Sequence, residues 1–319
     1  MQKLYIFPLW CKVCCFVFLC FEFFSCFFFI FSVFSIDKLV KMLYHIYCIG
    51  VKVGFLWRKG MENTKIRMIF CDVDGTLLNR GAKVVHGEVF ETIKKALSSN
   101  INICIASGRS YPDLKELFYS VVNDVTFICS DGALVVEKNN ISYSSPLNKS
   151  QVACMSKTYK SDYEAMVIYA KDYTYYLSDK ELPELGTKIT FDEVSKIPGD
   201  VFKVAFYQLS QKAKIKLDNL GIKSGILNKV YEDQFWTEYI RAGTDKGTAA
   251  KSVQKRYGVS ISETAAFGDN LNDLGMLRRA RVTFAANNAR PEVVSMCKFK
   301  TNNVNKEISN IIEKGDRYE

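Results

Sequence analysis

Histidine is scarce in this chain of 319 residues, which contains only His45 and His86. A Ser-His-Asp triad needs a histidine beside its nucleophile, and most catalytic zinc sites use two or three histidines. Both classes of site are therefore poorly supported. If the chain is an enzyme, carboxylates, hydroxyls and lysines must carry out its chemistry.

A disulfide framework is also missing. Six of the eleven cysteines lie in the first 60 residues, and the others stand singly along the chain. Isolated cysteines in apolar runs usually behave as small buried hydrophobes, so a reducing compartment is expected. Cys11 and Cys14 have CxxC spacing, but no second pair completes a metal site. The isolated cysteines are Cys71, Cys104, Cys129, Cys154 and Cys297.

No basic stripe with interleaved aromatic residues is present, although the formal charge of the chain is +9. Residues 1–60 hold seven Lys and Arg against Glu22 and Asp37, so residues 61–319 carry only +4. This charge is too small to predict binding to nucleic acid.

A hydrophobic run from Val13 to Phe34 contains one charged residue, Glu22. Its 22 residues would span a bilayer as a helix, and the excess of Lys and Arg after it would place the rest of the chain in the cytoplasm. A cleaved signal peptide fits poorly, because the run is long and no small-residue cleavage site follows it. Two interpretations of residues 1–60 remain: a membrane anchor, or a spurious extension upstream of Met61, which we favour.

From residue 66 onward, apolar runs alternate with segments of helical spacing, which predicts a parallel sheet with helices on both faces. The segment 141–235 differs: its runs are shorter, it is rich in Tyr and Lys, and Pro183, Pro198 and Gly199 interrupt it. We therefore predict an α/β protein with a Rossmann-like core, 61–140 and 236–319, and an α+β insert at 141–235. Strands are expected at 66–71, 101–106, 125–129, 264–267 and 282–285, and helices at 88–99, 114–121, 246–257 and 271–279.

The first candidate motif, Asp72-Val73-Asp74-Gly75, directly follows a predicted strand. Two carboxylates two residues apart point the same way if strand geometry persists, and Gly75 permits a sharp turn. One carboxylate can attack phosphorus while the other protonates a leaving oxygen and later activates water. The alternative is an Asp-Gly turn with solvated acids, but the position after a buried strand favours a functional role.

Two further segments suit a phosphate group. Ser107, Gly108 and Arg109 follow the second predicted strand, where a hydroxyl and backbone N–H groups can bind phosphate oxygens. Taken alone, this Ser-Gly pair is more typical of an ordinary turn. Lys246 opens a predicted helix, where the helix dipole disfavours a cation, so a role in neutralising phosphate is one explanation. A helix cap at Asp245 is the other.

The fourth motif follows the strand at 264–267. It contains Asp269, Asn272 and Asp273, and the two acids lie four residues apart, on one face if a helix begins there. Hard oxygen ligands of this kind suit Mg²⁺. An N-cap with a solvated first turn is the alternative. Because the carboxyl ends of parallel strands meet at one edge of a sheet, the four motifs can form one site.

Together, DVDGTL, ASGR, the lysine of TDKG and FGDNLNDLGML resemble the four motifs of the haloacid dehalogenase superfamily, in order and spacing. The insert resembles the type-2 cap of the Cof-like sugar-phosphate phosphatases. The resemblance implies that Asp72 is the nucleophile and Asp74 the general acid/base. Ser107 and Lys246, with Gly108, Arg109 and Asn272, would hold the phosphoryl group. The ligands of Mg²⁺ would come from Asp72, Asp74 through its backbone carbonyl, and Asp269, with Asp273 and Asn272 supporting the site.

The second aspartate separates two activities of the superfamily. Its dehalogenases lack this residue, because a halide needs no protonation, so Asp74 favours a phosphatase acting on a small phosphorylated metabolite such as a sugar phosphate. A membrane partner is expected only if residues 1–60 are retained. A phosphomutase with the same intermediate and a catalytically silent phosphosugar-binding protein remain as alternatives.

The chain departs from the family pattern at Asp131, Asn287 and Asn303. These departures bear on substrate choice and efficiency, not on the nucleophile or the metal. Tyrosines of the insert could contact a ligand, although packing or exposure to solvent is the commoner use. They are Tyr163, Tyr169, Tyr173, Tyr175 and Tyr176.

Overall fold

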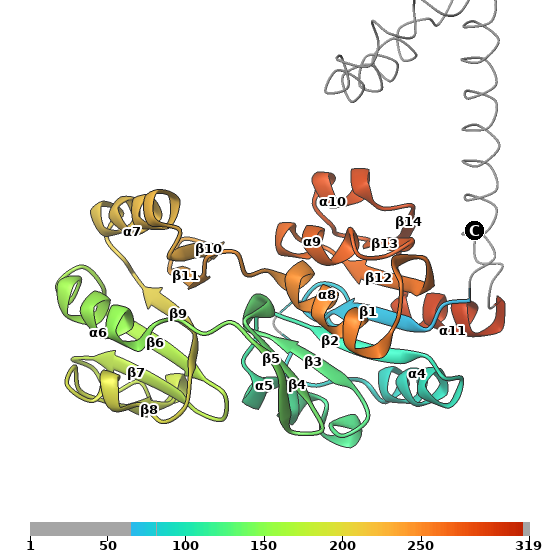
Figure 1. The fold of residues 1–319 in the computed structure, drawn as a ribbon, viewed down its shortest axis with the longest axis horizontal. Coiled ribbons are helices and arrows are strands. Elements are labelled where there is room, and N and C mark those ends of the chain that lie inside the picture. Colours follow the sequence, from blue (N-terminus) through green and yellow to red (C-terminus); the bar gives the residue numbers. More distant parts are fainter. Residues whose placement is uncertain (1–64, 81, 315–319) are drawn as a thin grey trace, which may run out of the picture. The chain divides into compact units, whose positions relative to one another are not determined.

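The computed structural model describes residues 65–80 and 82–314 (Figure 1). The hydrophobic run at 13–34 and both of its interpretations lie outside the described residues. Among the helices of these two described ranges, none has the length and apolar character needed to cross a bilayer.

An eight-stranded sheet forms the core, in the order β14-β13-β12-β1-β2-β3-β4-β5. Its first six strands run parallel, which confirms the predicted α/β class, whereas β4 and β5 are antiparallel. The antiparallel edge was not predicted; it arises because Lys138 and Asn139 both adopt positive φ and form a tight two-residue hairpin. The bounds are β1 Met68–Asp72, β2 Asn102–Ala106, β3 Thr126–Cys129, β4 Leu134–Glu137, β5 Asn140–Ser144, β12 Thr264–Gly268, β13 Val282–Ala286 and β14 Phe299–Thr301.

Both faces of this sheet are covered by helices (Figure 1). Along β1, Ile69 and Cys71 face one hydrophobic cluster, which includes residues of α4 and α11, while Met68 and Phe70 face another, which includes residues of α8, α9 and α10. A strand buried on both faces needs a continuous apolar run, which is what the sequence supplies. The helices are α4 Gly87–Ser98, α5 Tyr111–Leu117, α8 Lys246–Tyr257, α9 Leu274–Leu277, α10 Pro291–Met296 and α11 Val304–Lys314.

A second sheet has six strands in the order β10-β11-β9-β6-β7-β8. Two helices, α6 Lys149–Thr158 and α7 Gln211–Ser224, pack on it around residues such as Val152 and Leu217. We refer to this sheet and its helices as the cap. Its strands are β6 Ala165–Ala170, β7 Thr174–Ser178, β8 Thr187–Lys188, β9 Val201–Tyr207, β10 Leu227–Glu232 and β11 Trp236–Arg241.

The cap extends further along the chain than the predicted insert. Strand β11 pairs with β9 and β10, so the boundary predicted at 235 falls within a hairpin. The turn of this hairpin is fixed by Asp233, whose Oδ1 accepts hydrogen bonds from the backbone N–H groups of Phe235 and Trp236 at 2.8 and 2.6 Å. At the other boundary, β5 belongs to the core sheet up to Ser144.

Two predicted helices are shorter in the structure. Helix α5 begins at a capping box formed by Ser110 and Asp113, and the end of the predicted segment is a 3₁₀ turn, η2 Tyr119–Val121. The segment 271–279 forms a 3₁₀ turn, η7 Leu271–Asp273, followed by α9. Further 3₁₀ turns are η3 Ser130–Gly132, η4 Pro183–Leu185, η5 Val194–Lys196 and η6 Ile261–Glu263.

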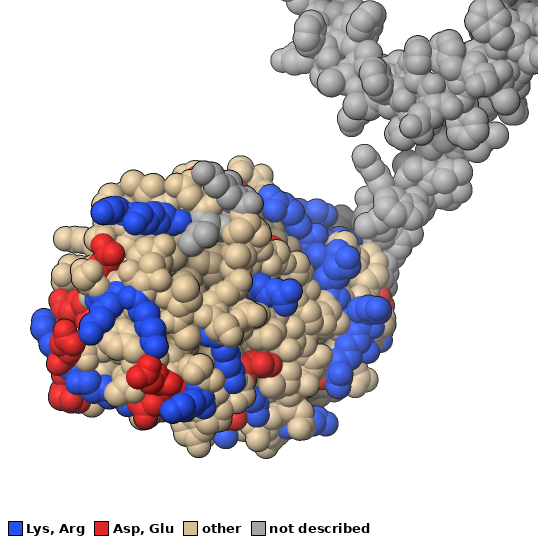
Figure 2. All heavy atoms as spheres, turned by 60° about the vertical axis from the view of Figure 1, so that its left-hand side comes forward, with Lys and Arg blue, Asp and Glu red and all other residues tan. Residues whose placement is uncertain are grey.

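Charged side chains on the visible face are interspersed with uncharged ones (Figure 2). Acidic and basic side chains lie close together at one end of that face, and mostly basic ones appear toward the other end. Cys71, Cys104 and Cys129 are buried, as predicted, and burial raises the pKa of each free thiol above its usual value.

Candidate active site

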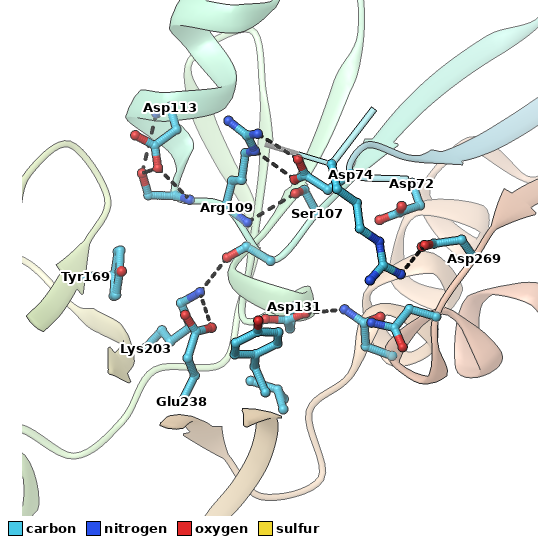
Figure 3. A pocket seen from close by; sticks show the side chains of 17 residues that line it. Asp72, Asp74, Ser107, Arg109, Asp113, Asp131, Tyr169, Lys203, Glu238 and Asp269 are labelled. Atoms are coloured by element: carbon cyan, nitrogen blue, oxygen red, sulfur yellow. Dashed lines mark hydrogen bonds and ion pairs between the residues drawn. The ribbon is translucent and has the colours of Figure 1, made fainter. Parts of the chain in front are cut away.

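Residues far apart in sequence meet at the carboxyl ends of the core strands. The Nζ atom of Lys246 lies 2.6 Å from Asp72 Oδ1 and 2.7 Å from Asp273 Oδ1, and all three side chains are buried. A cavity of about 410 Å³ is lined by Asp72 of this cluster (Figure 3). Its walls come from both the core and the cap. They include Asp72, Asp74, Ser107, Gly108, Arg109, Asp269 and Asn272 of the predicted set.

Asp72 is the last residue of β1, and the chain then folds into a tight turn. The N–H groups of Leu77 and Leu78 donate to the carbonyls of Asp72 and Val73 at 3.3 and 2.9 Å. Gly75 has a φ of +95°, and a Cβ atom at this position would overlap the Asp269 carboxylate. Glycine is therefore required here for two reasons: the backbone conformation and the close approach of Asp269.

The Asp269–Asp273 loop holds its own acids in place. Asp273 Oδ2 accepts hydrogen bonds from the backbone N–H groups of Asp269 and Asn270, each at 3.0 Å, while its Oδ1 accepts from Lys246. Asp269 Oδ2 lies 2.6 Å from Nη2 of Arg80. Asp72, Asp269 and Asp273 each offer a carboxylate oxygen, and these atoms lie within 4.8 Å of one another.

The electrostatics of this cluster favour an additional cation. Burial raises the pKa of Asp72 to about 8, and the neighbouring charge of Asp273 adds to the effect, although Lys246 opposes it. Burial disfavours a charged Lys246, yet Asp273 and Asp72 outweigh burial and raise its pKa above the usual value. The pKa values of Asp72 and Lys246 can both be raised because one ammonium group is shared between two carboxylates. This sharing leaves Asp72 with uncompensated negative charge.

The second carboxylate of the first motif, Asp74, is held by an arginine. Nε and Nη2 of Arg109 donate to Asp74 Oδ2 and Oδ1 at 2.8 and 2.6 Å (Figure 3). Nη2 also donates to the Ala82 carbonyl at 3.2 Å. The side chain predicted to bind phosphate is thus directed at Asp74. Ser107 lines the cavity, and its Oγ accepts the Arg109 backbone N–H at 3.1 Å.

Asp131 enters the cavity from the loop after β3. Three successive residues, Ser130, Asp131 and Gly132, have positive φ, a conformation costly for the first two. The resulting turn buries Asp131 and brings its Oδ1 2.8 Å from Nδ2 of Asn272. Sequence reasoning noted Asp131 only as a departure from a family pattern. Its position at the end of a strand was the available signal.

The cap contributes a polar group that sequence reasoning missed. Lys203, on β9, donates to Glu238 Oε2 at 2.7 Å and to the Gly108 carbonyl at 2.6 Å, and lies 4.7 Å from the centre of the Tyr169 ring (Figure 3). It links the cap to the predicted phosphate loop. No sequence motif marked Lys203 or Glu238, since strand pairing alone brings β9 and β11 together. Of the five tyrosines considered, only Tyr169 lines the cavity.

The two other departures lie away from the cavity lining. Asn303 Oδ1 accepts the backbone N–H of Lys306 at 2.9 Å, and so caps the first turn of α11. Asn287 lies in the turn after β13. Of the three positions, Asp131 alone faces the cavity.

The donor set fits a hard divalent cation. Asp72 Oδ2 is buried and has no hydrogen-bond partner in the described structure, which leaves an anionic oxygen free to coordinate. The Asp74 carbonyl accepts none of the recorded hydrogen bonds of the Asp72–Leu78 turn. Oxygen donors with excess negative charge are what Mg²⁺ prefers.

Comparison with known proteins identifies the family. The family model described as haloacid dehalogenase-like hydrolase matches residues 69–311. The chain is 24% identical over 267 residues to the 5-amino-6-(5-phospho-D-ribitylamino)uracil phosphatase YbjI of Escherichia coli, covering 80% of this chain and 97% of that protein.

Solved structures show the same fold. A phosphatase of the haloalkanoate superfamily from Bacteroides thetaiotaomicron superposes with a TM-score of 0.64 at 24% identity, over 77% of this chain and 95% of that one. A subclass IIB sugar phosphatase gives a TM-score of 0.63 at 19% identity, over 76% and 98% of the two chains. At these identities the likeness establishes the fold alone.

Proposed function

The chain belongs to the haloacid dehalogenase-like hydrolases, as a phosphatase of that family, and we propose that it cleaves a small organic phosphate monoester through a phosphorylated Asp72. The observation that carries this proposal is the contact of Lys246 with Asp72 and Asp273 beneath a cavity lined by Ser107 and Asp269. This arrangement supports a mechanism in which one carboxylate is the nucleophile and the other groups compensate the negative charge.

Mg²⁺ is the proposed cofactor. Asp72, Asp269 and the backbone carbonyl of Asp74 would hold it, and when bound it would offset negative charge on the phosphoryl oxygens. Both carboxylate oxygens of Asp273 already accept hydrogen bonds, from Lys246 and from two backbone N–H groups. We therefore assign Asp273 the role of orienting Lys246 and the loop, rather than that of a direct ligand.

The first chemical step would use Asp72 and Asp74. One carboxylate oxygen of Asp72 attacks phosphorus, an O–P bond forms, and the bond from phosphorus to the ester oxygen breaks. Lys246 orients the nucleophile through Oδ1, and Ser107 binds a phosphoryl oxygen. Asp74 gives a proton to the leaving oxygen, which requires that it carry that proton and release its bidentate contact with Arg109.

The second step returns the nucleophile. Asp74 takes a proton from water as the water oxygen bonds to phosphorus, and the bond between phosphorus and Asp72 breaks to release inorganic phosphate. Arg109 holds the Asp74 carboxylate in place between turnovers. The cap would exclude bulk water from the cavity during both steps.

The division of the chain into a core and an inserted cap is part of this proposal. The two separate sheets, each with its own hydrophobic cluster, support it. In this arrangement the cap supplies Lys203, Glu238 and Tyr169 to the cavity, where they would contact the part of the substrate beyond the phosphate.

Release of phosphate from p-nitrophenyl phosphate by the full-length protein tests the proposal. We expect turnover that requires Mg²⁺, stops with EDTA and is lost in Asp72→Asn. Asp192→Asn is the control, because it removes an exposed carboxylate that pairs with Lys157 at 2.7 Å on the cap. Turnover by Asp72→Asn at the parental rate would contradict the proposal.

The same assay separates the alternatives. A phosphomutase would transfer the phosphoryl group to a second sugar phosphate and would release little phosphate without a bisphosphate activator. A silent binding protein would bind phosphate esters but leave them intact in the presence of Mg²⁺.

A further inference from the structure

The end of the cavity farther from Asp72 has an unusual balance of charge. The cations of the cavity wall are Arg80, Arg109 and Lys203, and each lies within 2.7 Å of a carboxylate oxygen. The fourth cation of the site, Lys246, contacts two carboxylates. Among the cavity-lining residues described, Arg80 and Arg109 pair with Asp269 and Asp74, the acids of the proposed phosphate site, and only Lys203 pairs with a carboxylate of the cap, that of Glu238.

Lys203 is the nearest cation to the cap end of the cavity, but its charge is already compensated on three sides. Its ammonium group donates to Glu238 and to the Gly108 carbonyl, and it faces the Tyr169 ring. Its side chain is 4% exposed. Burial disfavours its charged form, but Glu238 and Tyr169 outweigh burial and raise the pKa of Lys203.

At the cap end of the cavity, the polar atoms that lack a hydrogen-bond partner are acceptors. Glu238 Oε1 and Asp131 Oδ2 accept no hydrogen bond from any described residue, whereas the other oxygen of each carboxylate is occupied. Both residues line the cavity. A substrate hydroxyl or ammonium group would satisfy these oxygens, whereas a carboxylate or second phosphate would be repelled by them.

On the premise of the phosphatase activity proposed above, we propose that this cavity selects phosphate monoesters whose leaving group is neutral or cationic and carries hydroxyl or amino donors. It excludes esters with a second anionic group. Glu238 and Lys203 set this preference, with Asp131 Oδ2 contributing a further hydrogen-bond acceptor.

Three commercial esters of similar size test the preference, since they differ mainly in the charge of the group beyond the phosphate. Glucosamine 6-phosphate carries an ammonium group, glucose 6-phosphate is neutral there, and 6-phosphogluconate carries a carboxylate. We expect the full-length protein with Mg²⁺ to hydrolyse the first two with kcat/KM at least tenfold above that of the third.

Two substitutions should move this selectivity in opposite directions. Glu238→Gln leaves Lys203 uncompensated, so the ratio of kcat/KM for glucosamine 6-phosphate over 6-phosphogluconate should fall at least tenfold. Lys203→Met leaves Glu238 uncompensated, so the ratio should rise even if all rates decrease. Damage to packing alone would not give opposite signs. Glu164→Gln is the matched control, because its ion pair with Lys180 is also 2.7 Å long but lies outside the cavity lining.

The outcomes distinguish this inference from its premise. Equal kcat/KM for the three esters, or turnover of p-nitrophenyl phosphate without turnover of the neutral and cationic esters, would overturn the inference alone. Ratios that shift in the same direction in both variants would also overturn it. Absence of turnover with every ester, p-nitrophenyl phosphate included, would instead refute the proposed function.

Discussion

Replacement of Asp72 by Asn should stabilise the metal-free protein at alkaline pH while it abolishes hydrolysis. The buried Asp72 carboxylate shares one ammonium group with Asp273, and Asp269 adds a further negative charge. Asn has nearly the same shape but no charge. The variant therefore removes the electrostatic penalty and keeps an acceptor oxygen for Lys246.

The size of the effect follows from the pKa of Asp72. The folded state raises this pKa from 3.8 to about 8, so the folded protein binds the proton more tightly than the unfolded chain. The stability of the parent should therefore fall as pH rises through this interval and level off above it. At about 1.4 kcal/mol per pKa unit the limit is about 6 kcal/mol. We expect about 2–3 kcal/mol, because relaxation and water entry reduce the penalty of a buried charge.

Urea unfolding in EDTA at pH 5 and pH 9, followed by circular dichroism, measures this difference. The free energy of unfolding of Asp72→Asn should exceed that of the parent only slightly at pH 5 and by the whole expected difference at pH 9. Mg²⁺ should stabilise the parent far more than the variant. Asp192→Asn, whose side chain is 84% exposed, should leave the free energy of unfolding unchanged at both pH values. An Asp72→Asn protein with the parental free energy of unfolding at pH 9 in EDTA would refute the reasoning.

Three further substitutions test other parts of the site. Asp74→Asn should lower kcat by about 10²–10⁴-fold, and by less for p-nitrophenyl phosphate than for an alkyl phosphate, because p-nitrophenolate leaves with little need of a proton; an equal loss with both esters would argue against Asp74 as the acid. Gly75→Ala should destabilise the protein by at least about 2 kcal/mol in urea and weaken Mg²⁺ binding, since its Cβ would overlap Asp269. Gly199 has a φ of +68° and open space around it, so Gly199→Ala should lower the free energy of unfolding by only about 1 kcal/mol. Equal losses of stability in the two variants would contradict the proposed overlap with Asp269. Lys246→Gln should cost about 3–5 kcal/mol at pH 8, because two buried carboxylates lose their cation, and a stable variant would show that Lys246 does not hold this cluster.

Much of the core could be predicted because its strands and helices are marked by patterns of neighbouring residues in the sequence. Strands buried on both faces read as continuous apolar runs, and Lys246–Tyr257 is a helix at its predicted bounds. Strand β11 was assigned to the core because a strand carries no mark of the sheet it joins; that choice depends on pairing with β9. The register of β9 against β11 also decides that Lys203 meets Glu238.

The sequence by itself determined which residues could do the chemistry: an aspartate pair after a strand, a lysine at a helix start and an acid cluster after another strand. Spacing along the chain sufficed, because parallel strands present their carboxyl ends at one edge. Only the tertiary structure decided how these groups are paired. Arg109 contacts Asp74, both oxygens of Asp273 are occupied, and Asp131 faces the cavity. The physical reason is that hydrogen bonds and ion pairs depend on distances of about 3 Å between side chains remote in sequence, which a linear pattern does not encode.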